Sequence, residues 1–150
     1  EHNAPDKRAE RLEAGKFMDT FQPTDTDCRI QDILTALAFL RARRDMTGRV
    51  NLIGLEEAGL WCLFASAIDN QVAVTVADLN AFPVDNDDAW IKDYYIPCIR
   101  SIGDVRTAAA LIAPRTLLVV NTERAEKAFG PWAKTERALL NTPALLEAVK

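Results

Sequence analysis

The chain has 150 residues and a mass of 16.6 kDa; 49% of its residues are apolar and 27% are charged. A chain of this length forms one domain and buries roughly 70% of the surface that its unfolded form exposes. The composition excludes an intrinsically disordered chain, a collagen and a disulfide scaffold. Because the net charge is −4 and no apolar run reaches the roughly 20 residues of a membrane span, we expect neither nucleic acid nor a membrane as a partner.

The three cysteines, Cys28, Cys62 and Cys98, are widely spaced along the chain. An odd number at such spacing predicts neither a disulfide framework nor a zinc site. Since Cys62 and Cys98 lie among apolar residues, we expect buried, reduced thiols there. The sequence gives no reason to expect a metal or a cofactor.

The first 27 residues are polar, and we expect a surface arm over 1–27 and a single domain over 28–150. The arm has no basic segment followed by an apolar one, so it is not the start of an intact secretory precursor. The compartment is left open, since a signal peptide can be removed.

Helical and strand-like segments alternate after the arm. The first predicted helix runs from Ile30 to about Met46, and Asp25, Thr26 or Asp27 can cap it. We then predict a strand over Val50–Gly54, a helix over Glu57–Ile68, a strand over Val72–Ala77 and a loop over 78–90. Short helices over 91–100 and 103–112, a strand over Thr116–Asn121, and helical segments over 123–129 and 134–149 complete the prediction.

This alternation predicts an α/β fold, a three-layer αβα arrangement around a short, mainly three-stranded parallel sheet. The strands are almost continuously apolar, which is typical of strands buried on both faces. Three strands leave two apolar edges that need cover. We therefore expect a partner at those edges, either a second copy of the chain or a missing N-terminal half.

The segment VNLIGLEEAGLWCLFASA joins the first strand to a helix through a turn with Gly54 and Gly59 at its ends. A P-loop is excluded, because Leu60 and Trp61 follow where Lys and Ser or Thr are needed. A dinucleotide fingerprint is excluded, because Glu56 stands in place of its second glycine. The turn fits a nucleophile elbow, Gly-x-Ser-x-Gly after a strand, with Glu56 at the position of the serine.

Several segments together resemble the C-terminal half of an α/β-hydrolase domain, and most of all the acetyl xylan esterase and dienelactone hydrolase-like enzymes. The segments are QDILTALAFL, GLEEAG, VAVTVAD, YYIPCIRSIGD and APRTLLVVN. The similarity extends from about Asp32 to Asn121. It implies relatives that hydrolyse esters, with the catalytic acid placed after the strand that ends at Asn121.

The catalytic triad that this resemblance implies is degenerate. Glu56 stands at the nucleophile position, Glu123 stands near the acid position, and the lone histidine, His2, precedes the domain. A Ser–His–Asp mechanism needs a base that takes the proton of the nucleophile and an acid that orients the base. We therefore expect a non-catalytic binding or scaffolding domain, part of a larger hydrolase-like protein, that lacks Ser–His–Asp esterase activity.

Two alternatives stay open. The first is an active carbohydrate esterase that uses residues outside this chain or the carboxylates of Glu56 and Glu123. Glu57 and Asp78 are candidate binding residues, because they follow strand ends where ligands bind in open α/β sheets. Glu56 and Glu57 have a simpler explanation as acids that interact favourably with the dipole of the following helix. The second alternative is a flavodoxin-like module that binds a small ligand.

Four aromatic side chains are candidates for a sugar-binding surface, although core packing is the simpler explanation for them. They are Trp61, Trp90, Tyr94 and Tyr95. The acidic segment from Asp85 to Asp88 is not an EF-hand, since the glycine and glutamate of that loop are missing. We expect Asp87 or Asp88 to cap the next helix instead.

Overall fold

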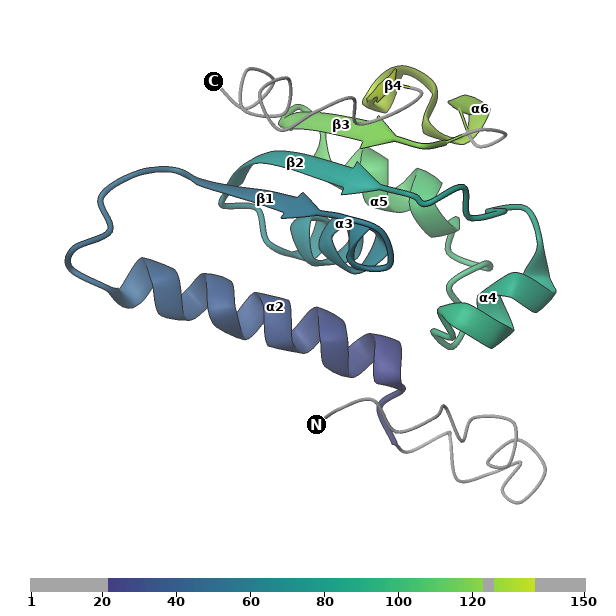
Figure 1. The fold of residues 1–150 in the computed structure, drawn as a ribbon, viewed down its shortest axis with the longest axis horizontal. Coiled ribbons are helices and arrows are strands. Elements are labelled where there is room, and N and C mark those ends of the chain that lie inside the picture. The colour runs from purple at the N-terminus through teal and green to yellow at the C-terminus, as the bar shows by residue number, and fades with distance from the viewer. Residues whose placement is uncertain (1–21, 123–125, 137–150) are drawn as a thin grey trace.

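The computed structural model describes residues 22–122 and 126–136 (Figure 1). Its sheet has four parallel strands in the order β1-β2-β3-β4: β1 (Val50–Gly54), β2 (Val72–Asp78), β3 (Thr116–Val120) and β4 (Lys134–Glu136). The helices are α2 (Asp25–Ala42), α3 (Ala58–Ile68), α4 (Asp87–Asp93), α5 (Asp104–Ile112), α6 (Glu126–Phe129) and the 3-10 turn η2 (Gly130–Trp132). The predicted α/β class, with helices packed on a sheet of three main parallel strands, is confirmed.

Helix α3 is the central helix of the fold. It packs on β1 and β2, with α5 on one side of it and α2 on the other (Figure 1). Because alternate side chains of a strand point to opposite faces, Ala77, Leu117 and Val119 join the main core under α3 and α5. Val76 and Leu118 belong to a separate small cluster with Val120. None of the helices described is long and apolar enough to cross a membrane.

Helix α2 begins earlier and ends earlier than its apolar periodicity predicts. Thr24 is the N-cap and forms a capping box with Asp27, in which each side chain accepts a hydrogen bond from the backbone N–H of the other residue, at 3.1 and 2.9 Å. The helix therefore includes the last three residues of the expected arm. At the other end it stops at Ala42, four residues before Met46.

The helix predicted over 91–100 is wrong, because α4 covers Asp87–Asp93 and turns follow it. The cap is Asn86, not Asp87 or Asp88. Its side-chain oxygen accepts hydrogen bonds from the backbone N–H groups of Asp88 and Ala89, at 2.9 and 3.2 Å. This local cap fixes the start of the helix within the segment predicted as a loop.

The helix predicted over 134–149 is also wrong at its start, since Lys134–Glu136 pairs with β3 as the short strand β4. Residues 137–149 of that prediction, and 123–125 of the helical segment before it, lie outside the described residues.

Two glycines allow α3 to approach the sheet closely. A Cβ atom added to Gly59 would lie 1.6 Å from the backbone oxygen of Asp78, at the end of β2. A Cβ atom on Gly54 would lie 2.5 Å from the backbone oxygen of Ala58 and 2.8 Å from the Cβ of Cys62. The tight strand–helix packing expected of the turn GLEEAG is therefore present, and glycine is required at both of its ends.

We predict that Gly59→Ala lowers the free energy of unfolding by about 3 kcal/mol, because the new methyl group displaces α3 from β2. Gly48→Ala is the matched control: no atom lies within 4 Å of the added Cβ, so the change should stay within about 0.5 kcal/mol. Urea unfolding followed by circular dichroism measures both. Equal stability of the two variants would contradict the close approach.

Candidate functional site

The carboxylate of Asp78 connects the ends of three strands. Its Oδ1 accepts hydrogen bonds from the backbone N–H of Asn80 at 2.8 Å and from the side-chain amide of Asn121 at 2.7 Å. Its Oδ2 accepts from the backbone N–H of Glu56 at 3.3 Å. Asp78 is buried, with 7% of its surface exposed, so these donors offset the cost of removing the charged group from water.

The backbone at this edge of the sheet is strained after β1, β2 and β3. Four residues that are not glycine have positive φ angles there: Glu56 at 51°, Asn80 at 48°, Ala81 at 56° and Asn121 at 50°. Such conformations cost about 1–3 kcal/mol each and cluster at functional sites. Glu56 in particular has the positive φ of a sharp strand-to-helix turn, at the position where an elbow carries its nucleophile.

The predicted site residues fall into three groups. Glu56 and Glu57 are exposed just before α3, and Glu57 is its N-cap residue without a side-chain capping hydrogen bond. Asp78 lies beside the backbone of Glu56, but its oxygens already accept hydrogen bonds. Glu123 lies outside the described residues. The structure therefore brings Asp78 to the turn, where its hydrogen bonds hold the strand ends together.

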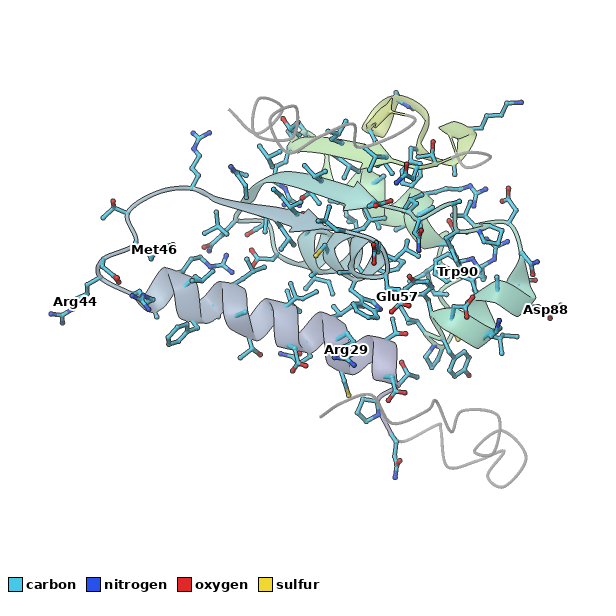
Figure 2. All side chains as sticks on the ribbon, in the orientation of Figure 1. Arg29, Arg44, Met46, Glu57, Asp88 and Trp90 are labelled. Atoms are coloured by element: carbon cyan, nitrogen blue, oxygen red, sulfur yellow. The ribbon has the colours of Figure 1, made fainter. Side chains whose placement is uncertain are left out.

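A polar pocket of about 530 Å³ opens beside this turn, and we refer to it as the carboxyl-edge pocket. Glu57, the N-cap residue of α3, and Trp61 within that helix form one side, the segment 79–83 after β2 forms another, and residues 92–94 at the end of α4 complete it. Figure 2 shows Glu57 at the end of the sheet to which the strands point, opposite Arg44 and Met46. Ligands in open α/β sheets bind at this end.

The aromatic residues lie in the core, in the carboxyl-edge pocket or in both, since Tyr94 belongs to the core cluster and also lines the pocket. Trp90 and Tyr94 are buried, and the Nε1–H of Trp90 donates to the backbone oxygen of Val84 at 2.9 Å, so the core interpretation is confirmed for these two. Trp61 is half-buried and lines the pocket. Its Nε1 is buried with no hydrogen-bond partner among the described residues, and the guanidinium of Arg29 lies 5.5 Å from its ring centre.

The phenol of Tyr94 lies near several negatively charged side chains. Burial and, to a smaller extent, the nearby carboxylates of Glu57, Asp93 and Asp78 together raise the pKa of its phenol to about 12, because both disfavour an added negative charge. The hydroxyl donates to the backbone oxygen of Glu57 at 3.2 Å, so it also ties α4 to the start of α3.

Sequence reasoning missed Asn80, Asn121 and Asp93 at this site. Asn80 and Asn121 lie at strand ends, as Asp78 does. The argument that ligands bind at strand ends, which identified Asp78 as a candidate, therefore applies to them as well. Asp93 reaches the pocket only because α4 ends there, which the wrong position of that helix concealed. Arg29 lies on a different helix, and no sequence signal connects it to Trp61.

The cysteine expectations are partly wrong. Cys62 is buried under the turn, and burial raises the pKa of its thiol to about 11, which keeps it protonated and unreactive. Cys98 is exposed, as is Cys28. In the described part of the chain, no group of three or more His, Cys, Asp or Glu side chains is arranged to hold a metal ion.

Comparison of the chain with protein-family models, with curated proteins and with solved structures found no match in any of the three. Function must therefore be argued from the site itself.

We predict that Tyr94→Phe weakens the loss of stability at alkaline pH. An unfolded tyrosine ionises near pH 10 and the folded one near pH 12, so the unfolded chain releases this proton first and stability falls across that window. Between pH 10 and 12, the wild type should therefore lose up to roughly 2 kcal/mol of unfolding free energy relative to the variant.

Urea unfolding at a series of pH values measures this difference. Tyr95→Phe, which removes a phenol outside the carboxyl-edge pocket, is the control and should follow the wild type. Identical pH dependence of wild type and Tyr94→Phe would contradict the assignment.

Proposed function

We propose that this chain is a binding or scaffolding domain of α/β-hydrolase type that does not carry out Ser–His–Asp ester hydrolysis, and that it belongs to a larger hydrolase-like protein. The observation that carries the proposal is the turn at Glu56. It has the positive φ and the glycine-dependent packing of an elbow, and a carboxylate in place of the nucleophile.

The topology supports this proposal over a flavodoxin-like module. The described strands follow one another in sequential order, β1-β2-β3-β4, as the resemblance to the second half of a hydrolase sheet implies. A flavodoxin-like sheet has the order 2-1-3-4-5 and binds its cofactor where that order reverses. The four described strands contain no such reversal.

The chemistry at the edge supports binding more than catalysis. Acyl transfer needs a nucleophile and a base that removes its proton, and the only histidine of the chain is His2. Of the carboxylates at the turn, Asp78 accepts three hydrogen bonds that hold the strand ends, which leaves Glu56 as the candidate of the active alternative there. The carboxyl-edge pocket next to the turn has the size of a small-ligand site, and polar side chains such as Glu57, Asn80 and Asp93 line it.

We predict that the purified chain hydrolyses p-nitrophenyl acetate and butyrate no faster than its Glu56→Ala variant does. Both rates should equal that of the unfolded protein, since losing triad members costs several orders of magnitude in rate. Stopped-flow or plate absorbance at several pH values measures the rates. Hydrolysis that is saturable in the wild type and absent in Glu56→Ala would establish the active alternative, with a carboxylate in the catalytic role.

The open edge of the sheet supports the larger assembly. Among the described residues β1 pairs only with β2, and its sequence, VNLIG, has neither the charge nor the proline with which natural proteins protect an edge. Ile53 on this strand is 40% exposed. The proposed partner at this edge is a further strand, supplied by a second copy of the chain or by an N-terminal half.

We predict that the isolated chain associates with itself through β1 and that Ile53→Lys suppresses this association, since a lysine on an edge strand opposes pairing. Ile91→Lys is the matched control, because Ile91 on α4 is 44% exposed and lies away from the edge. Sedimentation velocity over a range of concentrations measures the effect. A wild type that stays monomeric, or an equal effect of both variants, would contradict pairing at this edge.

A further inference from the structure

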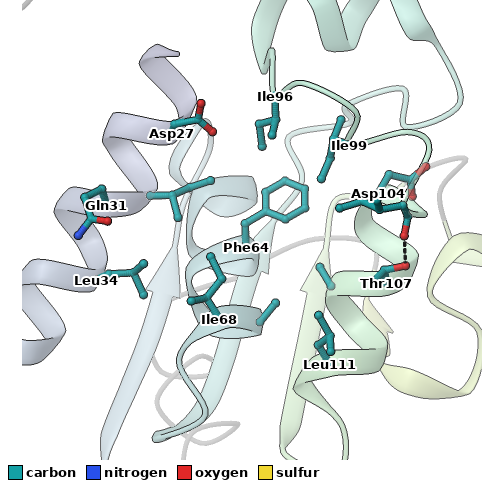
Figure 3. Close-up of a pocket in the computed structure, with 14 residues that line it drawn as sticks. Asp27, Gln31, Leu34, Phe64, Ile68, Ile96, Ile99, Asp104, Thr107 and Leu111 are labelled. Atoms are coloured by element: carbon teal, nitrogen blue, oxygen red, sulfur yellow. Dashed lines mark hydrogen bonds between the residues drawn. The ribbon is translucent and has the colours of Figure 1, made fainter. Parts of the chain in front are cut away.

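A second cavity, of about 350 Å³, lies on the helical side of the molecule, and we call it the helix groove. Helix α2 forms one wall, α5 forms the other and α3 forms the floor. Figure 3 shows Phe64 of α3 between Leu34 of α2 and Leu111 of α5, with Ile96 and Ile99 closing one end. The groove thus has an apolar lining on three helices of the main core.

The groove leaves large aliphatic side chains in contact with water. Ile68 is 65% exposed, Ile102 is 62% exposed and Leu111 is 60% exposed, and all three line the groove. Contiguous exposed apolar surface of this kind marks binding sites on soluble proteins, because covering it with another apolar group is favourable.

The polar groups that border the groove already have partners within the protein. Asp27 accepts from the backbone N–H of Thr24 at 2.9 Å, and the amide of Gln31 donates to Thr35 at 3.3 Å. The hydroxyl of Thr107 donates to the backbone oxygen of Ile102. An occupant therefore gains hydrophobic contact and little from hydrogen bonding.

The fourth polar residue, Asp104, is the most firmly held of them. It is 3% exposed and forms ion pairs with Arg100 and Arg106, which also reach Asp87 and Asp85. This network fixes the loop before α4 to the start of α5, so this end of the groove is rigid and already has its charges paired.

We propose that the helix groove binds the alkyl chain of a small uncharged ligand. Fourteen residues line it, fewer than the roughly 20–30 residues per side of a stable protein interface, so its size fits a small molecule better than a folded partner. The polar groups at its border already have partners within the protein, so a charged head group would lose its hydration there without gaining a partner. The site lies apart from the carboxyl-edge pocket and does not depend on the function proposed above.

The test is a series of straight-chain alkanols, from butanol to decanol, titrated into the full chain with isoleucine and leucine methyl groups observed by NMR. Affinity should rise about fourfold with each added methylene, the value expected for full burial, and then stop rising once the groove is filled. Octanoate should bind at least tenfold more weakly than octanol. Shifts that do not saturate, or affinity that rises without limit, would overturn the proposal.

Surface variants locate the binding. Leu111→Ser should weaken octanol binding at least fivefold, whereas Phe39→Ser, which changes an equally exposed side chain of α2 outside the groove, should leave it unchanged. Equal loss in both variants would overturn the proposal. So would a dimer that dissociates only in Leu111→Ser, since the groove would then be covered by a second copy of the chain.

Discussion

The carboxylate of Asp78 is the constraint on which the arrangement at the carboxyl edge of the sheet depends. It holds the turn after β1, the loop after β2 and the residue after β3 together through Glu56, Asn80 and Asn121. The backbone of the same residue meets Gly59 so closely that no side chain fits between them. One buried charge and one missing side chain thus fix where α3 begins relative to three strands. Hydrogen bonds to an ionised acceptor are the stronger kind, which suits a group that must hold strained backbone.

The shape of the turn is therefore independent of the side chain at position 56. Gly54, Gly59 and Asp78 set its geometry, and the side chain of Glu56 points into solvent with no part in that packing. The residues that stabilise the turn are thus different from the residue whose side chain the turn exposes. This separation explains why the turn alone is weak support for activity, and why function has to be argued from the residues that the turn presents.

The sequence predicted those parts of the fold that depend on local pattern. The bounds of β1 were correct and those of β2 and β3 differ by one residue, because runs such as VAVTVA are apolar on both faces. The predictions were wrong where one side chain, or pairing with a strand distant in the sequence, determines the type or the bounds of an element. Asn86 starts α4 several residues before the predicted helix, and β4 is a strand only because β3 lies beside it. The carboxyl-edge pocket is lined by residues from α3, the loop after β2 and α4. Because these segments are distant in the sequence, no local sequence pattern could predict the pocket.

The two ends of the sheet differ in a way that follows from this arrangement. At the end where the strands begin, Arg115 donates hydrogen bonds to the backbone oxygens of Ser66, Asp69 and Val72, at 2.8 to 3.1 Å, and Arg41 pairs with the side chain of Asp69. The described segments that enter β1, β2 and β3 contain no residue with positive φ. The strained residues that follow these strands all lie at the opposite end, with the carboxyl-edge pocket. Arginine side chains thus hold the segments that enter β2 and β3, whereas the residues that follow these strands adopt the strained backbone.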